Sequence, residues 1–210
     1  TAELLRQHTA KTPTTPAAPT LTLTLEIAHA AQYGELLQVL EWLQKGGHVD
    51  ALSENDLGLL HAAAYSGQLR VAEELLQRGA SVDLRSPKGT TALMGAAAMG
   101  KHAMVRLLLK HKASTDLQNE IRVTALMLAA SEGHQECVQE LLQASASTEL
   151  RDEQGGTAQE AAKKGGHAAI ATLIRQHAST PPATVAAPTP NLSGPRVRIG
   201  GLQARPELNG

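Results

Sequence analysis

The sequence contains almost no aromatic residues. It has no Phe, two Tyr and one Trp, so aromatic side chains make up 1% of its 210 residues. Large aromatic side chains usually supply much of the buried area of a globular core. The apolar residues are here mainly Ala and Leu, which suits thin layers of small helices rather than one thick core.

Other absences narrow the class of protein. A single Cys excludes an internal disulfide and fits a reducing, intracellular compartment, either cytoplasmic or nuclear. No apolar run approaches the roughly 20 residues of a membrane span, and no charged start followed by an apolar run indicates a secretory signal. The formal net charge of -1 gives no general attraction to nucleic acid or to anionic lipid. We therefore expect neither a membrane nor a nucleic acid as partner.

The sequence does contain an internal repeat. Residues of one type recur every 33 positions (67 − 34 = 33), and an array of repeated units is the architecture that such a period predicts. Three series keep this phase: Gly34, Gly67, Gly100, Gly133 and Gly166; Ala30, Ala63, Ala96, Ala129 and Ala162; and the acidic Asp50, Asp83, Asp116 and Glu149.

Residues 91–110 show the plan of one unit. Thr91 stands at an N-cap position, where its hydroxyl can accept a hydrogen bond from a free backbone N–H. A short, Ala-rich helix extends from there to Met99, and Gly100 can adopt the left-handed conformation that ends a helix. A second helix then extends to Lys110, with apolar residues at helical spacing that predict one buried stripe.

The same signals return in later units. Thr124 and Thr157 repeat the cap, and Glu160, three residues after Thr157, gives the spacing of a capping box. Residues 81–91 carry Asp, Pro and Gly, as a projecting turn does. Each unit is thus predicted to be a turn followed by two helices.

The complete pattern resembles the ankyrin-repeat family, whose 33-residue unit consists of a turn, a helix, a loop and a helix. The resemblance covers about residues 25–178 and implies an all-α fold. The implied fold is a solenoid of stacked helix-loop-helix units with projecting β-turns or hairpins. The expected units are 25–50, 51–83, 84–116, 117–149 and 150–178.

This chain departs from the family pattern at several positions. Ala92, Ala125 and Ala158 replace the family Pro, so the caps depend on Thr alone. The family His is kept only at His61, while Met94 and Met127 replace it later. These two substitutions remove hydrogen bonds that would tie the first helix to the turn.

Three further departures affect positions where the family has Gly. Arg122 stands at a turn position, and we expect the turn of the fourth unit to be distorted. Lys112 and Ser145 replace the Gly that follows the second helix.

Polar residues replace apolar ones in the first and last units. Gln38 stands where the second unit has Val71, and Gln159 stands where the fourth has Leu126. Arg175 likewise replaces an apolar residue. A finite stack needs polar outer faces to stay soluble, so we expect the five units to form a capped block.

The flanking segments predict further modules. Residues 1–10 resemble the last helix of such a unit, 11–24 read as a Pro/Thr/Ala-rich linker, and 179–195 as a Pro/Thr-rich linker. The opening residues recur near the end at an offset of 169 (175 − 6 = 169): Arg6, Gln7 and His8 match Arg175, Gln176 and His177. Either another ankyrin block precedes residue 1, or two low-complexity segments have converged. Residues 196–210 read as the start of a truncated β module or as a disordered tail.

The sequence offers no catalytic, metal-binding or cofactor-binding residues. His134 and Cys137 share a helix, but Cys137 occupies a core position, and a buried Cys usually behaves as a small apolar residue. No Cys/His cluster has zinc-ligand spacing, and neither a phosphate-binding loop nor a nucleophile elbow is present. We therefore expect no enzyme activity, no metal and no cofactor within these residues.

The third unit is rich in basic residues, and two interpretations are open. Its basic residues could attract an acidic peptide, or they could exchange surface ion pairs with acidic neighbouring units, which we favour. The residues are Arg85, Lys88, Lys101, Arg106, Lys110 and Lys112.

The resemblance implies a non-catalytic scaffold or adaptor that binds a partner protein on a concave face of turns and first helices. The alternative is a regulatory or targeting arm of a larger multidomain enzyme whose catalytic part lies outside these residues. Tyr65 and Met99 are the expected anchors, because Tyr and Met are enriched at interface cores. The positions that match the variable contact positions of the family are Gln32, Tyr33, Leu57, Tyr65, Ser66, Lys88, Thr90, Met99, Glu120, Val123, Ser131 and Glu132.

Overall fold

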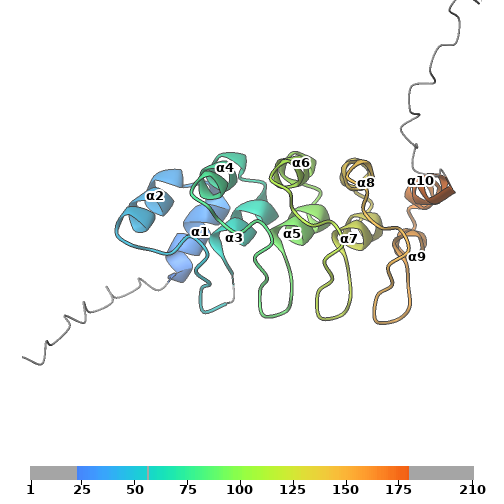
Figure 1. Ribbon diagram of the computed structural model, residues 1–210, viewed down its shortest axis with the longest axis horizontal. Coiled ribbons are helices and arrows are strands. Elements are labelled where there is room, and N and C mark those ends of the chain that lie inside the picture. The colour runs from blue at the N-terminus through green and yellow to red at the C-terminus, as the bar shows by residue number, and fades with distance from the viewer. Residues whose placement is uncertain (1–22, 56, 180–210) are drawn as a thin grey trace, which may run out of the picture. The chain divides into compact units, whose positions relative to one another are not determined.

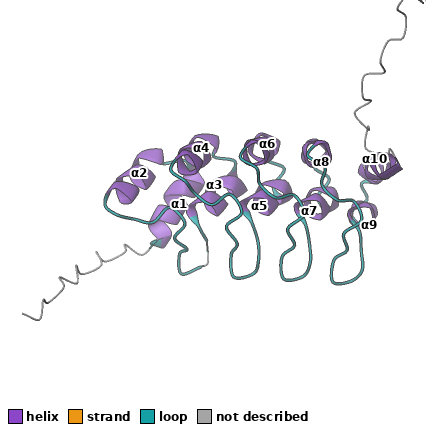
Figure 2. Ribbon diagram, viewed as in Figure 1, coloured by secondary structure: helices purple, strands orange, loops and turns teal. Residues whose placement is uncertain are grey.

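The computed structural model describes residues 23–179 with the exception of residue 56. The expected helix at 1–10, the linkers apart from their residues 23, 24 and 179, and the segment 196–210 lie outside this range. Every regular element in the described part is a helix, which confirms the predicted all-α class (Figure 2).

The helices form two layers, and each unit contributes one helix to each layer (Figure 1). Apart from α1, which begins 34 residues before α3, helices in one layer begin 33 residues apart (92 − 59 = 33), so the sequence period is also the structural period. The first helices are α1 (Leu25–Tyr33), α3 (Leu59–Ser66), α5 (Ala92–Ala98), α7 (Ala125–Ser131) and α9 (Ala158–Lys164). The second helices are α2 (Leu36–Gln44), α4 (Leu69–Gln77), α6 (His102–Lys110), α8 (Gln135–Gln143) and α10 (Ala168–Ser179).

The predicted capping residues act as expected. Thr91 Oγ1 accepts a hydrogen bond from Met94 N, and Thr124 Oγ1 accepts one from Met127 N, each at 3.3 Å. At the start of α9, Thr157 and Glu160 form the complete capping box. These bonds satisfy backbone donors that a helix leaves unpaired at its N-terminus. The periodic glycines from Gly34 to Gly166 all have φ between 65° and 82°, so they form equivalent corners of successive helix pairs.

The core is a thin continuous layer between the two rows of helices. The first helices bury small side chains such as Ala63 and Ala96, which lets neighbouring helices pack closely. The second helices bury a leucine stripe that includes Leu75 and Leu108. In the first unit Trp42 occupies the same phase (75 − 42 = 33) and is buried there.

The end units are polar where the sequence predicts it. Gln38 and Arg175 are exposed, whereas the apolar residues at their positions in neighbouring units, Val71 and Leu142, are buried. Leu23, within the expected linker, is buried and forms a parallel bridge with Ser53.

Three members of the acidic series join the first four units in succession. Asp50 Oδ1 accepts a hydrogen bond from Ser81 N, and Asp83 Oδ1 accepts one from Ser114 N. Asp116 repeats the contact with Ser147, and all three distances are 2.9 Å. The 33-residue spacing of these acids therefore reflects a repeated contact in the stack.

The turn of the fourth unit is not distorted, so the expectation for Arg122 is wrong. Arg122 has φ of 59° and its N–H donates to Asn119 O, as Gly89 (φ 73°) donates to Ser86 O in the third unit. Asn119 Oδ1 also accepts from Val123 N at 2.8 Å. These bonds hold the arginine in a left-handed conformation that is usually unfavourable for a residue with a Cβ.

Candidate protein-binding face

The turns project from the layer of first helices, on the side away from the second helices (Figure 1). We call the exposed surface of the first helices and turns the binding face. All twelve predicted contact residues lie in these elements or in the residues that cap the first helices. Six are exposed: Tyr33, Tyr65, Lys88, Met99, Glu120 and Glu132. Six are half-buried: Gln32, Leu57, Ser66, Thr90, Val123 and Ser131.

Three large side chains form an apolar row on this face. Tyr33 and Tyr65 lie in the last turns of α1 and α3, and Met99 directly follows α5. Their exposed fractions are 69%, 48% and 39%. Because α3 packs against both α1 and α5, these three side chains lie on three neighbouring units. We call Tyr33, Tyr65 and Met99 the apolar row.

Leu57 and Val123 contribute less to this surface than the sequence predicts. Both are half-buried and pack against the core, so only part of each side chain is available to a partner. The turn geometry requires this packing, because Leu57 N donates to Ser53 Oγ at 3.2 Å and Val123 N donates to Asn119 Oδ1.

The sequence interpretation missed Ile121. This residue lies at the turn of the fourth unit and its side chain is 54% exposed. It occupies the phase of Lys88 (121 − 88 = 33), which is among the predicted contact residues. The available signal was an apolar residue at a turn position that is polar in the other units.

A pocket of about 240 Å³ opens on the binding face between the second and third units. Four predicted residues line it, namely Leu57, Tyr65, Lys88 and Thr90. His61 also lines it and is buried. His61 Nε2 donates to Thr90 O at 3.0 Å, which is the link between helix and following turn that Met94 and Met127 do not make.

Burial controls the protonation of His61. The loss of solvent lowers the pKa of the imidazole, and the hydrogen bond to the carbonyl oxygen of Thr90 opposes this effect only in part. The ring is therefore neutral near pH 7. Within the described residues, its Nδ1 has no hydrogen-bond partner.

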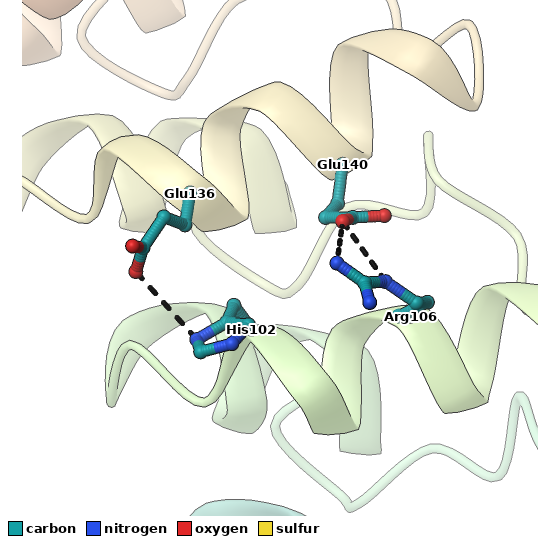
Figure 3. A network of polar contacts seen from close by, with 4 residues as sticks. All are labelled: His102, Arg106, Glu136 and Glu140. Atoms are coloured by element: carbon teal, nitrogen blue, oxygen red, sulfur yellow. Dashed lines mark hydrogen bonds and ion pairs between the residues drawn. The ribbon is translucent and has the colours of Figure 1, made fainter.

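The basic residues of the third unit do not converge on one site. On the second helices, Arg106 Nε donates to Glu140 Oε1 at 3.0 Å, and His102 Nδ1 lies 3.6 Å from Glu136 Oε2 (Figure 3). Arg85 Nη2 instead donates to Gln118 O in the next turn. These contacts favour the interpretation that the basic residues pair with neighbouring units, and not the interpretation that they form a single band that binds an acidic peptide.

His134 and Cys137 do not form a reactive pair. Cys137 is 1% exposed, and burial, reinforced by two nearby glutamates, raises the pKa of its thiol to about 11. His134 Nε2 donates to Ala98 O in the preceding unit at 3.0 Å. Both side chains therefore serve packing between units.

The described part of the chain contains neither a metal-binding cluster nor a membrane-spanning helix. No group of three or more His, Cys, Asp or Glu side chains in residues 23–179, residue 56 aside, is arranged to hold a metal ion. None of the described helices is long and apolar enough to cross a membrane.

Paired helices at a 33-residue period, with turns beside the first helices, define a helical-repeat solenoid. The sequence model of the family described as ankyrin repeats (3 copies) matches residues 27–119 and 112–183. The chain therefore belongs to the ankyrin-repeat family, whose members are generally protein–protein interaction modules and typically non-catalytic. No curated protein sequence matches the chain significantly.

Proposed function

We propose that the chain is a non-catalytic scaffold or adaptor module that binds a partner protein on its binding face. The observation that carries this proposal is the apolar row. Tyr33, Tyr65 and Met99 expose between 39% and 69% of their surfaces on three successive units. Their burial by a partner would remove apolar area from water, and Tyr and Met are enriched at interface cores.

Charged side chains beside the row would fix the orientation of the partner. Lys88, Glu120 and Glu132 are exposed on the same face and carry both signs of charge. Such a mixed rim contributes mainly to specificity and to the rate of association. The apolar row would then supply most of the affinity, as a few residues usually do in protein interfaces.

Site-specific photo-crosslinking tests the location of the interface. A photoreactive amino acid is placed in the full chain at position 33, 65 or 99, and at Glu73 or Lys110 on the second helices as controls. In an extract of the source cells, we expect one protein to crosslink from the three binding-face positions and not from the control positions. Crosslinks confined to the second helices would refute the proposal.

A substitution tests the energetic contribution of the row. Tyr65→Ala should weaken binding of the crosslinked partner by about 1 kcal/mol or more, which is about fivefold in Kd. The circular dichroism of the variant should match that of the unmodified chain. Leu37→Ala, which truncates an exposed apolar side chain on α2, serves as the matched control. Unchanged affinity for the Tyr65 variant would remove this residue from the interface.

A further inference from the structure

The turns of the later units are joined by backbone hydrogen bonds, but the described residues of the second and third turns are not. Glu120 N donates to Lys88 O, and Glu153 N donates to Ile121 O, both at 3.1 Å. The third unit has Pro87 at the equivalent position (120 − 33 = 87). Proline has no backbone N–H to donate, so this link cannot form between the second and third turns.

A side-chain link is missing at the same place. Arg85 Nη2 donates to Gln118 O at 2.7 Å, and Gln118 Nε2 donates to Arg151 O at 2.9 Å. Leu52 holds the equivalent position in the second unit (85 − 33 = 52), and its side chain has no hydrogen-bond donor. With residue 56 set aside, no hydrogen bond joins residues 52–57 to residues 85–90.

The first helix of the third unit leaves space beside these unlinked turns. Gly95 lines the pocket and has no side chain, whereas the fourth unit has Leu128 at the same phase (128 − 95 = 33). Leu128 packs partly buried against the core. The pocket between the second and third units is thus lined by residues of both unlinked turns and by Gly95.

The size of this pocket limits its occupant. Its volume of about 240 Å³ lies below the roughly 300–1,000 Å³ of typical small-molecule sites. It exceeds the cavity of about 150 Å³ that accommodates benzene in an engineered core. The pocket therefore suits one aromatic side chain, for which Leu57 and Tyr65 provide apolar and aromatic contacts.

The charge of the lining indicates what lies next to that side chain. Among the described lining residues, from which residue 56 is missing, Lys88 alone carries a full charge at neutral pH and none is a carboxylate. His61 is buried and uncharged near pH 7. A carboxylate on the partner, close to the inserted ring, would pair with the exposed Lys88 ammonium.

We infer that this pocket receives one aromatic side chain of the partner protein, from a segment with an Asp or Glu close to that residue. The inference rests on the proposed function and specifies which chemistry of partner the binding face selects. Lys88 would pair with the acidic residue, and Gly95 would leave room for the ring.

A pocket-filling variant tests this inference without unfolding the chain. In Gly95→Leu, the residue type of Leu128 replaces the glycine. A Cβ at position 95 would lie 3.9 Å from the nearest atoms of Tyr65, an ordinary contact. Because glycine is unfavourable inside a helix, the substitution should also favour α5. A loss of binding would therefore reflect the filled pocket and not a loss of fold.

The probe is a phage-displayed library of short random peptides, selected on the full chain. We expect enrichment of peptides with an aromatic residue next to, or nearly next to, an Asp or Glu. The most enriched peptide, made synthetically, should bind Gly95→Leu and Lys88→Glu about tenfold more weakly or worse. Lys101→Glu, the same charge change outside the pocket lining, should have a much smaller effect.

Two results would overturn the inference. One is selection of no aromatic-acidic class of peptide. The other is unchanged affinity of the selected peptide for Gly95→Leu. If that peptide instead loses affinity for Met99→Ala, the pocket is excluded while the proposed binding face stands. Crosslinking of the natural partner only from the second helices would exclude the binding face itself.

Discussion

The imidazole of His134 lies directly against Gly100 of the preceding unit. A Cβ at Gly100 would be 2.6 Å from His134 Nδ1, closer than any real Cβ contact. Gly100 also has φ of 65°. The position therefore needs glycine both for its conformation and for the space that the next unit occupies.

Gly100→Ala should lower the free energy of unfolding by about 2 kcal/mol, through left-handed strain and displacement of His134. Gly79→Ala is the matched control, since Gly79 has φ of 86° and no atom within 4 Å of an added Cβ. This control should lose only about 1 kcal/mol from backbone strain. Urea denaturation measures both, and equal losses would refute a packing role for His134.

Lys112→Gly should stabilise the chain. Lys112 has φ of 67°, a conformation that costs a residue with a Cβ about 1–2 kcal/mol. Glycine removes this strain, but it also makes the unfolded chain more flexible, which offsets part of the increase in stability. We expect a net increase of about 0.5–1 kcal/mol in urea denaturation. Lys110→Gly, two residues earlier at the end of α6, should instead lower stability by a similar amount. The prediction fails if both variants change in the same direction.

His61 should make stability sensitive to mild acid. Its pKa in the folded chain is below the ordinary value near 6.5, because burial opposes the charged form. Below about pH 6.5 the unfolded chain therefore binds more protons. The contribution of His61 is complete above this pH and decreases as the pH falls toward its folded pKa.

His61→Met tests this dependence with the residue type found at Met94 and Met127. Thr90 O keeps its hydrogen bond from Ser86 N at 2.9 Å, so the variant should remain folded. As the pH falls below about 6.5, the unmodified chain should lose more unfolding free energy than the His61→Met variant. If their unfolding free energies run parallel between pH 5 and about pH 7.5, His61 does not titrate as predicted.

Cys137 should be almost unreactive in the native state. Its pKa of about 11 compares with about 8.5 for a free Cys, so the thiolate fraction at neutral pH falls by about two orders of magnitude. Burial restricts reagent access further. Labelling with iodoacetamide should be at least about 100-fold slower than in denaturant. Comparable rates in the two conditions would show that the thiol is open to solvent.

The elements of the fold could be predicted because their signals are local. Thr91 caps a helix that starts at the next residue, and Gly100 follows its end. The turn at Arg122 was predicted wrongly for the opposite reason. Its strain is held by Asn119 within the turn and by the bond from Gln118 Nε2 to Arg122 O at 2.6 Å, neither of which follows from the local preference of arginine.

The exposed row was likewise accessible from the sequence, since Tyr65 and Met99 are large residues at an exposed phase of the repeat. Ile121 was not predicted, because the sequence alone does not show that its side chain is exposed in the turn. The pocket was not predicted, because no short segment contains it. Its lining comes from α3, α5 and the turns of two units.

By itself, the sequence determined the 33-residue period, the paired helices and the residues that cap them. These features depend on hydrogen bonds and side-chain spacing within a few residues of the backbone. Only the tertiary structure decided where adjacent units touch and where they leave a gap. A contact such as His134 on Gly100, or the absence of one beside Pro87, depends on two units stacked in a fixed register.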